Sequence, residues 1–188
     1  MVRLVFLILI LATSGMSLGQ GTGIDRLISR LKTLKEIVRI QEEKLPPPPP
    51  QRSSERKFLI WAKNTDDEVF PYIVFLAAPK GQRFFNLVSI RFENSPSFER
   101  ALYGFGFLVG VFESICLGLQ EPTINSIRAW TISAIEKIQQ NGSGQFNRSF
   151  GPVTVDLAGY QVFDIGELLI AYTRQDTPGK SWTRWCTY

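Results

Sequence analysis

Five consecutive prolines, Pro46–Pro50, constrain the fold of this 188-residue chain more than any other feature. Proline lacks the amide hydrogen that a helix needs and has a fixed φ, so a run of five ends any helix and favours polyproline II. With the polar residues that follow, the segment 46–57 is predicted to be a stiff linker. The chain is thereby divided into an N-terminal part and a globular domain at 58–188.

The first 19 residues have the pattern of a secretory signal peptide. Arg3 precedes an apolar run from Leu4 to Ala12, and small residues then lead to Gln20. A short membrane anchor is the competing interpretation, but the run is about nine residues long and a spanning helix needs roughly 20. We therefore expect a secreted or extracytoplasmic protein, either extracellular or periplasmic.

Residues 20–45 have the spacing of an amphipathic helix. Thr22 and Asp25 lie three residues apart, as in a capping box at a helix start. Apolar residues then alternate at three- and four-residue steps, as in a coiled coil. The residues expected to mediate oligomerisation are Ile24, Leu27, Leu31, Leu34 and Val38. The favoured interpretation is a self-associating stalk; docking of the helix onto the domain and binding to a membrane surface through its basic residues stay open.

The positive charge of the chain is concentrated in this N-terminal part. Residues 1–57 carry ten basic and five acidic side chains, whereas residues 58–188 carry eleven basic and twelve acidic ones. Nucleic-acid binding requires basic side chains clustered on a folded face, and those of the domain are scattered singly. We therefore expect no nucleic-acid partner.

The domain is predicted to be α+β, with an antiparallel sheet packed against two helices. Runs rich in β-branched and aromatic residues alternate with turn-forming residues, which is typical of strands. The expected strands are 58–62, 72–77, 84–92, 153–157 and 167–173. Ser95-Pro96 begins one helix that extends to about Leu117, and Glu121-Pro122 begins another that extends to Gln140.

Cysteine and histidine counts limit the chemistry of the chain. There is no histidine, which excludes His-based nucleophile pairs and His-ligated metals, and no metal or cofactor motif is found. The two cysteines, Cys116 and Cys186, are expected to form a disulfide after export. Asn141 and Asn147 begin glycosylation sequons, which are used only if the source is eukaryotic.

The segment Ala101–Leu119 contains a single charge, that of Glu113. It is interpreted as a buried core helix, with insertion into a membrane as the alternative. Glu113 is also the one carboxylate whose apolar surroundings suggest a raised pKa. An acid pair with Asp164 or Glu167 would provide a hydrolytic site, but a carboxylate paired with an arginine on a helix face is the more conservative interpretation.

The C-terminal octapeptide is rich in aromatic side chains. Such side chains are enriched at binding surfaces, which makes this segment a candidate ligand site. The candidate ligand-binding residues are Trp182, Arg184, Trp185 and Tyr188, although an aromatic-rich core explains the same composition. The sequence as a whole favours an extracytoplasmic, non-enzymatic binding protein of unknown ligand, oligomerised through its N-terminal helix. A membrane-active protein that inserts residues 101–119 is the alternative.

Overall fold

The computed structural model describes residues 22–175 and 186–188. Within them the protein is α+β, with a seven-stranded antiparallel sheet and three α-helices rather than the two expected. The elements, in chain order, are α1 (Gly23–Leu31), β1 (Ile37–Glu43), β2 (Arg52–Lys63), β3 (Val69–Pro79), β4 (Leu87–Ser95), α2 (Phe98–Val111), a π-turn η1 (Phe112–Cys116), α3 (Glu121–Asn141), β5 (Ser143–Phe150), β6 (Val153–Val162) and β7 (Ile165–Arg174).

The strands pair in the order β1-β2-β3-β4-β7-β6-β5. Alternating burial along each central strand places its apolar side chains on one face, as the two-residue period of a strand requires. A row of directly paired, fully buried side chains crosses five strands of this face. It consists of Phe58, Val74, Ile90, Ile170 and Leu157. These registers fix which face meets the helices, because a slip of one residue would expose the whole row.

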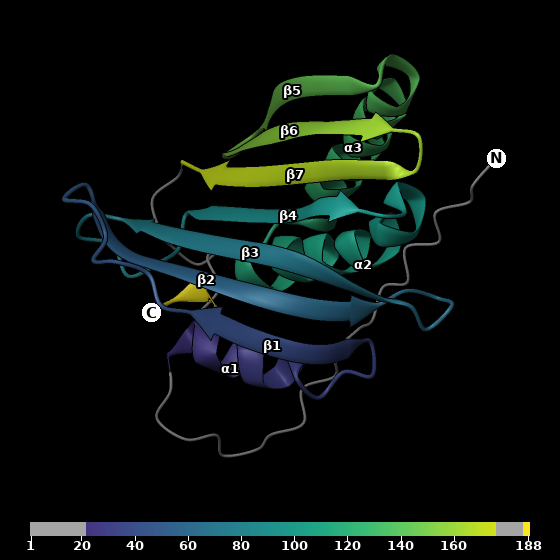
Figure 1. Cartoon of the computed structure of the whole chain (residues 1–188). Helices are drawn as coiled ribbons and strands as arrows, with labels where there is room; N and C mark the ends of the chain where they lie inside the picture. Colours follow the sequence, from purple (N-terminus) through teal and green to yellow (C-terminus); the bar gives the residue numbers. More distant parts are fainter. Residues whose placement is uncertain (1–21, 176–185) are drawn as a thin grey trace.

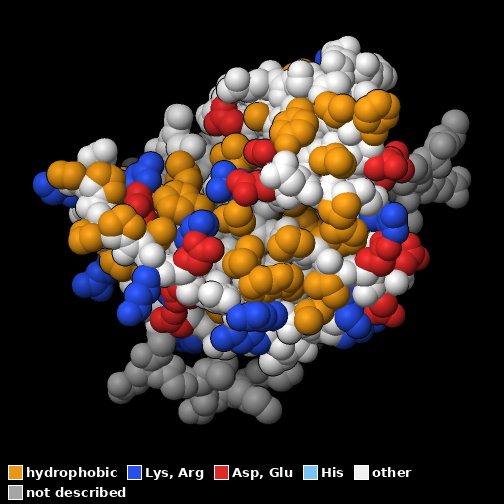
Figure 2. Space-filling model, in the orientation of Figure 1, with side chains coloured by type: hydrophobic (Ala, Val, Ile, Leu, Met, Phe, Trp, Pro, Cys, Tyr) orange, Lys and Arg blue, Asp and Glu red, His pale blue; other side chains and the backbone are white. Residues whose placement is uncertain are grey.

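All three helices contribute to one hydrophobic core on this face. Ile24 of α1, Leu108 of α2 and Ile127 of α3 are each fully buried in it. In Figure 1 the sheet lies in front of α2 and α3. Figure 2, in the same orientation, shows hydrophobic side chains interspersed with charged ones on the facing surface. The protein is thus a two-layer structure whose helices cover one side of the sheet.

The predicted coiled-coil stalk is not confirmed. The helix ends at Leu31, and residues 37–43 form β1, which pairs with β2. Ile24, Leu27 and Leu31 are buried in the protein's own core, Leu34 is partly buried, and the side chain of Val38 is 52% exposed on the strand. The helical stripe therefore docks onto the domain, which is the alternative that the sequence left open.

The physical reason is that a helix of this length gains little from propensity alone and depends on packing. The β-branched Ile37, Val38 and Ile40 gain more by extending the edge of a sheet, where Ile37 is buried opposite Ala62.

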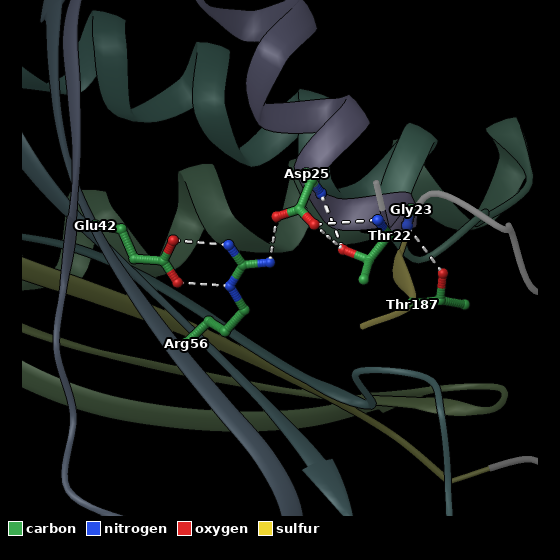
Figure 3. Close-up of polar contacts among 6 residues, drawn as sticks. All are labelled: Thr22, Gly23, Asp25, Glu42, Arg56 and Thr187. Atoms are coloured by element: carbon green, nitrogen blue, oxygen red, sulfur yellow. Dashed lines mark hydrogen bonds and ion pairs between the residues drawn. The ribbon is translucent and has the colours of Figure 1, made fainter. Parts of the chain in front are cut away.

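Figure 3 shows how α1 is fixed at its N-terminus. The capping box expected from the sequence is present: the Thr22 side chain accepts a hydrogen bond from the Asp25 amide, and the Asp25 carboxylate accepts one from the Thr22 amide at 3.0 Å. Arg56 of β2 donates to Asp25 at 2.7 Å and to both carboxylate oxygens of Glu42 at 2.6 and 2.7 Å. This guanidinium therefore connects α1, β1 and β2.

The stiff linker at 46–57 is not confirmed as a spacer between separate units. The prolines connect β1 to β2, two neighbouring strands of the same sheet, and residues 52–57 belong to β2. The Arg52 amide donates to the Pro49 carbonyl at 2.9 Å, which sets the start of the strand. Proline is tolerated here because a loop outside the strands requires no ladder hydrogen bonds.

The apolar segment 101–119 forms most of α2, the π-turn and the loop that follows. Ala101, Leu108 and Phe112 are fully buried. Among the described helices, none combines the length and the apolar character that a membrane span needs. The second expected helix is confirmed as α3, which ends where Gly142 adopts a left-handed φ of 78°.

Candidate functional site

A groove runs between α2 and α3 and encloses a volume of about 240 Å³. Its walls are mostly apolar, and its polar side chains come from both helices. The lining residues are Glu99, Leu102, Phe105, Gly106, Val109 and Glu113 from α2 and η1, and Arg128, Thr131, Ile132, Ile135, Glu136 and Gln139 from α3. A concave, largely apolar site with few polar groups is the usual form of a small-molecule site.

The groove arises because the two helices rest on different halves of the sheet. The hydroxyl of Tyr72 on β3 donates to the Ala101 carbonyl of α2 at 2.8 Å. On the other half, Trp130 of α3 packs edge-on against Phe150 of β5, with ring centroids 5.7 Å apart. Each helix is thus held by its own strands, and a furrow is left where their facing surfaces meet.

Glu113 lies at one end of this groove and is fully buried. The Tyr172 hydroxyl donates to its Oε1 at 2.6 Å. Among the described residues, its Oε2 has no hydrogen-bond partner, and the same is true of the buried Oγ1 of Thr131. Buried polar atoms without partners are rare and call for an explanation such as a ligand.

Burial raises the pKa of Glu113 to about 7, because a carboxylate is poorly solvated in this apolar surrounding. The hydrogen bond from Tyr172 and the positive charge of Arg128 act in the opposite direction without cancelling the effect. Burial and the adjacent carboxylate in turn raise the pKa of Tyr172 well above its ordinary value, so that the phenol remains a donor.

The π-turn places Glu113 in this position. The Leu117 amide donates to the Phe112 carbonyl at 2.8 Å, which is the five-residue step of a π-helix. The Glu113 carbonyl accepts from the Leu119 amide at 3.0 Å. Single π-turns inside α-helices are frequent at functional sites, because they change the direction of the side chains that follow.

The structure does not bring the suggested acid pair together. Tyr172, the partner of Glu113, points to the helix-covered face of β7, whereas Glu167 occupies the alternate face of that strand. Asp164 lies in the turn between β6 and β7 and is exposed, and its carbonyl accepts a hydrogen bond from the Phe98 amide at 2.7 Å. Neither carboxylate therefore lies beside Glu113 to act with it.

Most of the predicted C-terminal ligand site, namely Trp182, Arg184 and Trp185, lies outside the described residues. Tyr188 is described, and it packs within the protein. Its ring lies 5.6 Å from that of Phe85, and its hydroxyl donates to the Gln82 carbonyl at 2.9 Å.

The disulfide between Cys116 and Cys186 is confirmed, with Cα atoms 4.7 Å apart. The bond joins the end of the π-turn to the C-terminal residues. Next to it, the Thr187 hydroxyl accepts a hydrogen bond from the Gly23 amide at 3.2 Å (Figure 3). The Thr187 carbonyl accepts one from the Ile24 amide at 2.9 Å. The C-terminus, the π-turn and α1 are thereby held in one place.

The two predicted glycosylation residues are exposed. Asn141 is the last residue of α3, and Asn147 lies on the edge strand β5, where its side-chain amide donates to Asp156. Their glycosylation stays a prediction.

Among the polar side chains near Glu113, Arg128, Thr131 and Tyr172 were not identified from the sequence. Thr131 shares a helix face with Arg128 and Ile135, so helical spacing was a signal for it. Tyr172 had no signal, because it lies 59 residues from Glu113 along the chain.

Comparison of the chain with protein-family models, curated proteins and solved structures finds no match in any of the three. The function is therefore inferred from this groove and its chemistry.

Proposed function

We propose that the protein is an extracytoplasmic, non-enzymatic binding protein that holds a small, mainly apolar ligand in the groove between α2 and α3. One observation carries this proposal: an apolar groove ends at the buried Glu113, whose Oε2 lacks a partner among the described residues. The disulfide supports an oxidising compartment, since such bonds persist outside the cytoplasm.

Binding is favoured over catalysis because, within residues 22–175 and 186–188, the groove holds one buried carboxyl group and no second one beside it. Glu113 is hydrogen-bonded to a phenol whose pKa is raised, and Asp164 and Glu167 are not beside it. Glycoside hydrolysis uses two carboxyl groups on either side of the scissile bond. An apolar groove with few buried polar groups instead orients a ligand.

The test uses the exported chain and isothermal titration calorimetry with short alkyl compounds. We expect saturable binding in wild type and at least tenfold weaker binding in Ile132→Trp, because the indole would fill the groove from a side chain that is already 37% exposed. Val69→Trp is the matched control, since Val69 is 45% exposed and lies on β3 away from the groove. Equal binding by both variants would contradict the groove as the site.

Self-association through α1 stays a prediction. Its stripe residues Ile24, Leu27 and Leu31 would have to leave the core to form a coiled coil. Light scattering of the exported chain, with and without Leu27→Lys, distinguishes a stripe-mediated oligomer from a monomer.

The membrane-active alternative would require α2 to leave the same core, in which Ala101, Leu108 and Phe112 are fully buried. Co-sedimentation with anionic liposomes tests it.

A further inference from the structure

We infer that the ligand is an uncharged amphiphile with a hydroxyl group at one end of an apolar chain, and that this hydroxyl binds between Glu113 Oε2 and Thr131 Oγ1. The inference rests on the proposed function and adds the chemical class of the ligand.

Near Glu113, the groove contains two buried oxygen atoms that have no hydrogen-bond partner among the described residues, Glu113 Oε2 and Thr131 Oγ1. Glu113 Oε1 accepts a hydrogen bond from the Tyr172 hydroxyl at 2.6 Å, so Oε2 is the oxygen of this carboxyl group that is left to pair with a ligand. Thr131 Oγ1 from the facing helix is likewise buried without a partner among the described residues. A hydroxyl both donates and accepts, so it is the kind of group that pairs with a carboxyl oxygen and with a threonine hydroxyl. Leaving them unsatisfied is costly, and a ligand that pairs them gains that energy on binding.

The charges around this end disfavour an ionic head group. Among the described residues, the Arg128 charge acts on Glu113 from α3, and the Tyr172 hydroxyl of β7 donates a hydrogen bond to it. An ammonium would be attracted by ionised Glu113 but repelled by Arg128, and a carboxylate would be attracted by Arg128 but repelled by ionised Glu113. Each would therefore lose its hydration on burial for little net gain in charge interaction. A hydroxyl avoids both conflicts. It donates to Glu113 when that group is ionised and accepts from it when it is protonated.

The rest of the groove matches an apolar chain. Leu102, Phe105 and Val109 follow one another at helical spacing along α2, and Ile132 and Ile135 face them from α3. Beyond them, the groove ends at the exposed Glu99, Glu136 and Gln139. A chain that starts at Glu113 therefore lies along apolar walls and ends at solvent.

The test compares four probes with the same chain, namely n-octanol, n-chlorooctane, octanoate and octylammonium, by calorimetry on the exported chain. We expect n-octanol to bind about tenfold more tightly than n-chlorooctane, the value of one to two buried hydrogen bonds. Shortening the alcohol should weaken binding about fourfold per methylene. Thr131→Val, which keeps the shape and removes the hydroxyl, should reduce the preference for octanol over chlorooctane, because one of the two hydrogen bonds of the ligand hydroxyl is lost.

A second variant removes the carboxyl group from the site. Glu113→Leu with Tyr172→Phe removes the carboxyl group and its hydrogen-bond donor together, and it should weaken the preference for octanol because only Thr131 Oγ1 remains for the ligand hydroxyl. If Thr131→Val and this double variant both keep the wild-type preference for octanol, the proposed hydroxyl site is contradicted, whereas the groove remains the proposed binding site. Tighter binding of octanoate or octylammonium also overturns the hydroxyl class. If no probe binds to the wild-type protein, both this inference and the proposed function are contradicted.

Discussion

Glu113 is the residue at which burial and charge compete most directly. Its pKa is raised from 4.5 to about 7 in the folded protein, so between these values the folded state binds more protons than the unfolded state. The stabilising effect of that proton is complete below the unfolded pKa and is lost as pH rises through about 7.

Glu113→Gln removes this titration and keeps an oxygen for the Tyr172 hydroxyl. We expect the variant to match wild type near pH 5 and to exceed it at pH 8 by about 3 kcal/mol of unfolding free energy. Urea denaturation at a series of pH values measures the difference, with the exposed Glu136→Gln as the control. Parallel stability curves for wild type and Glu113→Gln would contradict the raised pKa.

Phe163 combines two unfavourable features at the tip of the β6–β7 hairpin. Its φ is 56°, a left-handed value, and its side chain is 92% exposed. Such a backbone costs an L-residue about 1–2 kcal/mol, part of which glycine avoids at the expense of chain entropy. We expect Phe163→Gly to raise the unfolding free energy by about 0.5 kcal/mol in chemical denaturation. Phe163→Ala keeps the strain and serves as the comparison; a glycine variant less stable than the alanine variant would argue against strain.

At the scale of elements, the position of α2 depends on a close approach to β3. A Cβ on Gly104 would lie 2.5 Å from the Tyr72 hydroxyl oxygen and 2.8 Å from its Cζ, whereas one on Gly110 would lie at an ordinary 3.6 Å from Arg128. Gly104→Ala should therefore push α2 from the sheet and lower stability by about 1–3 kcal/mol. Gly110→Ala, in the same helix, should be neutral or stabilising by up to about 1 kcal/mol. Thermal denaturation of the two variants checks this, and equal melting temperatures would count against it.

Some helices and strands could be predicted from the local sequence pattern alone. The central strands have β-branched and aromatic runs, and α3 has both its proline start and its glycine end, so these were predicted correctly. The edge strands were missed. Residues 37–43 continue the helical spacing of the preceding segment, and β5 has few apolar side chains, so neither has the local pattern of a strand. Each forms a strand because it is hydrogen-bonded to a neighbouring strand, β1 to β2 and β5 to β6.

At the scale of the whole molecule, the Cys116–Cys186 bond joins regions that are far apart in the chain. It spans 70 residues, for which loop closure predicts about 4 kcal/mol of stabilisation. We expect reduction to lower the urea midpoint strongly and to increase hydrogen exchange at α1, because the amide of Ile24 is hydrogen-bonded to Thr187 beside the bond. The Cys116→Ala, Cys186→Ala double variant should have the urea midpoint of the reduced protein, and adding a reductant should not change it. A reduced protein as stable as the oxidised one would contradict this role.

The sequence by itself determined the fold class, the central strands, the later helices, the capping box at Thr22 and the pairing of the two cysteines. These depend on side-chain period, on residues adjacent in the chain, or on there being only two thiols. Only the tertiary structure decided that the N-terminal stripe packs into the domain, that the prolines connect paired strands, and that Glu113 meets Tyr172 at a groove that Thr131 also lines. The reason is that edges, grooves and buried polar contacts are made between segments distant in sequence, and their energies depend on partners that no local pattern specifies.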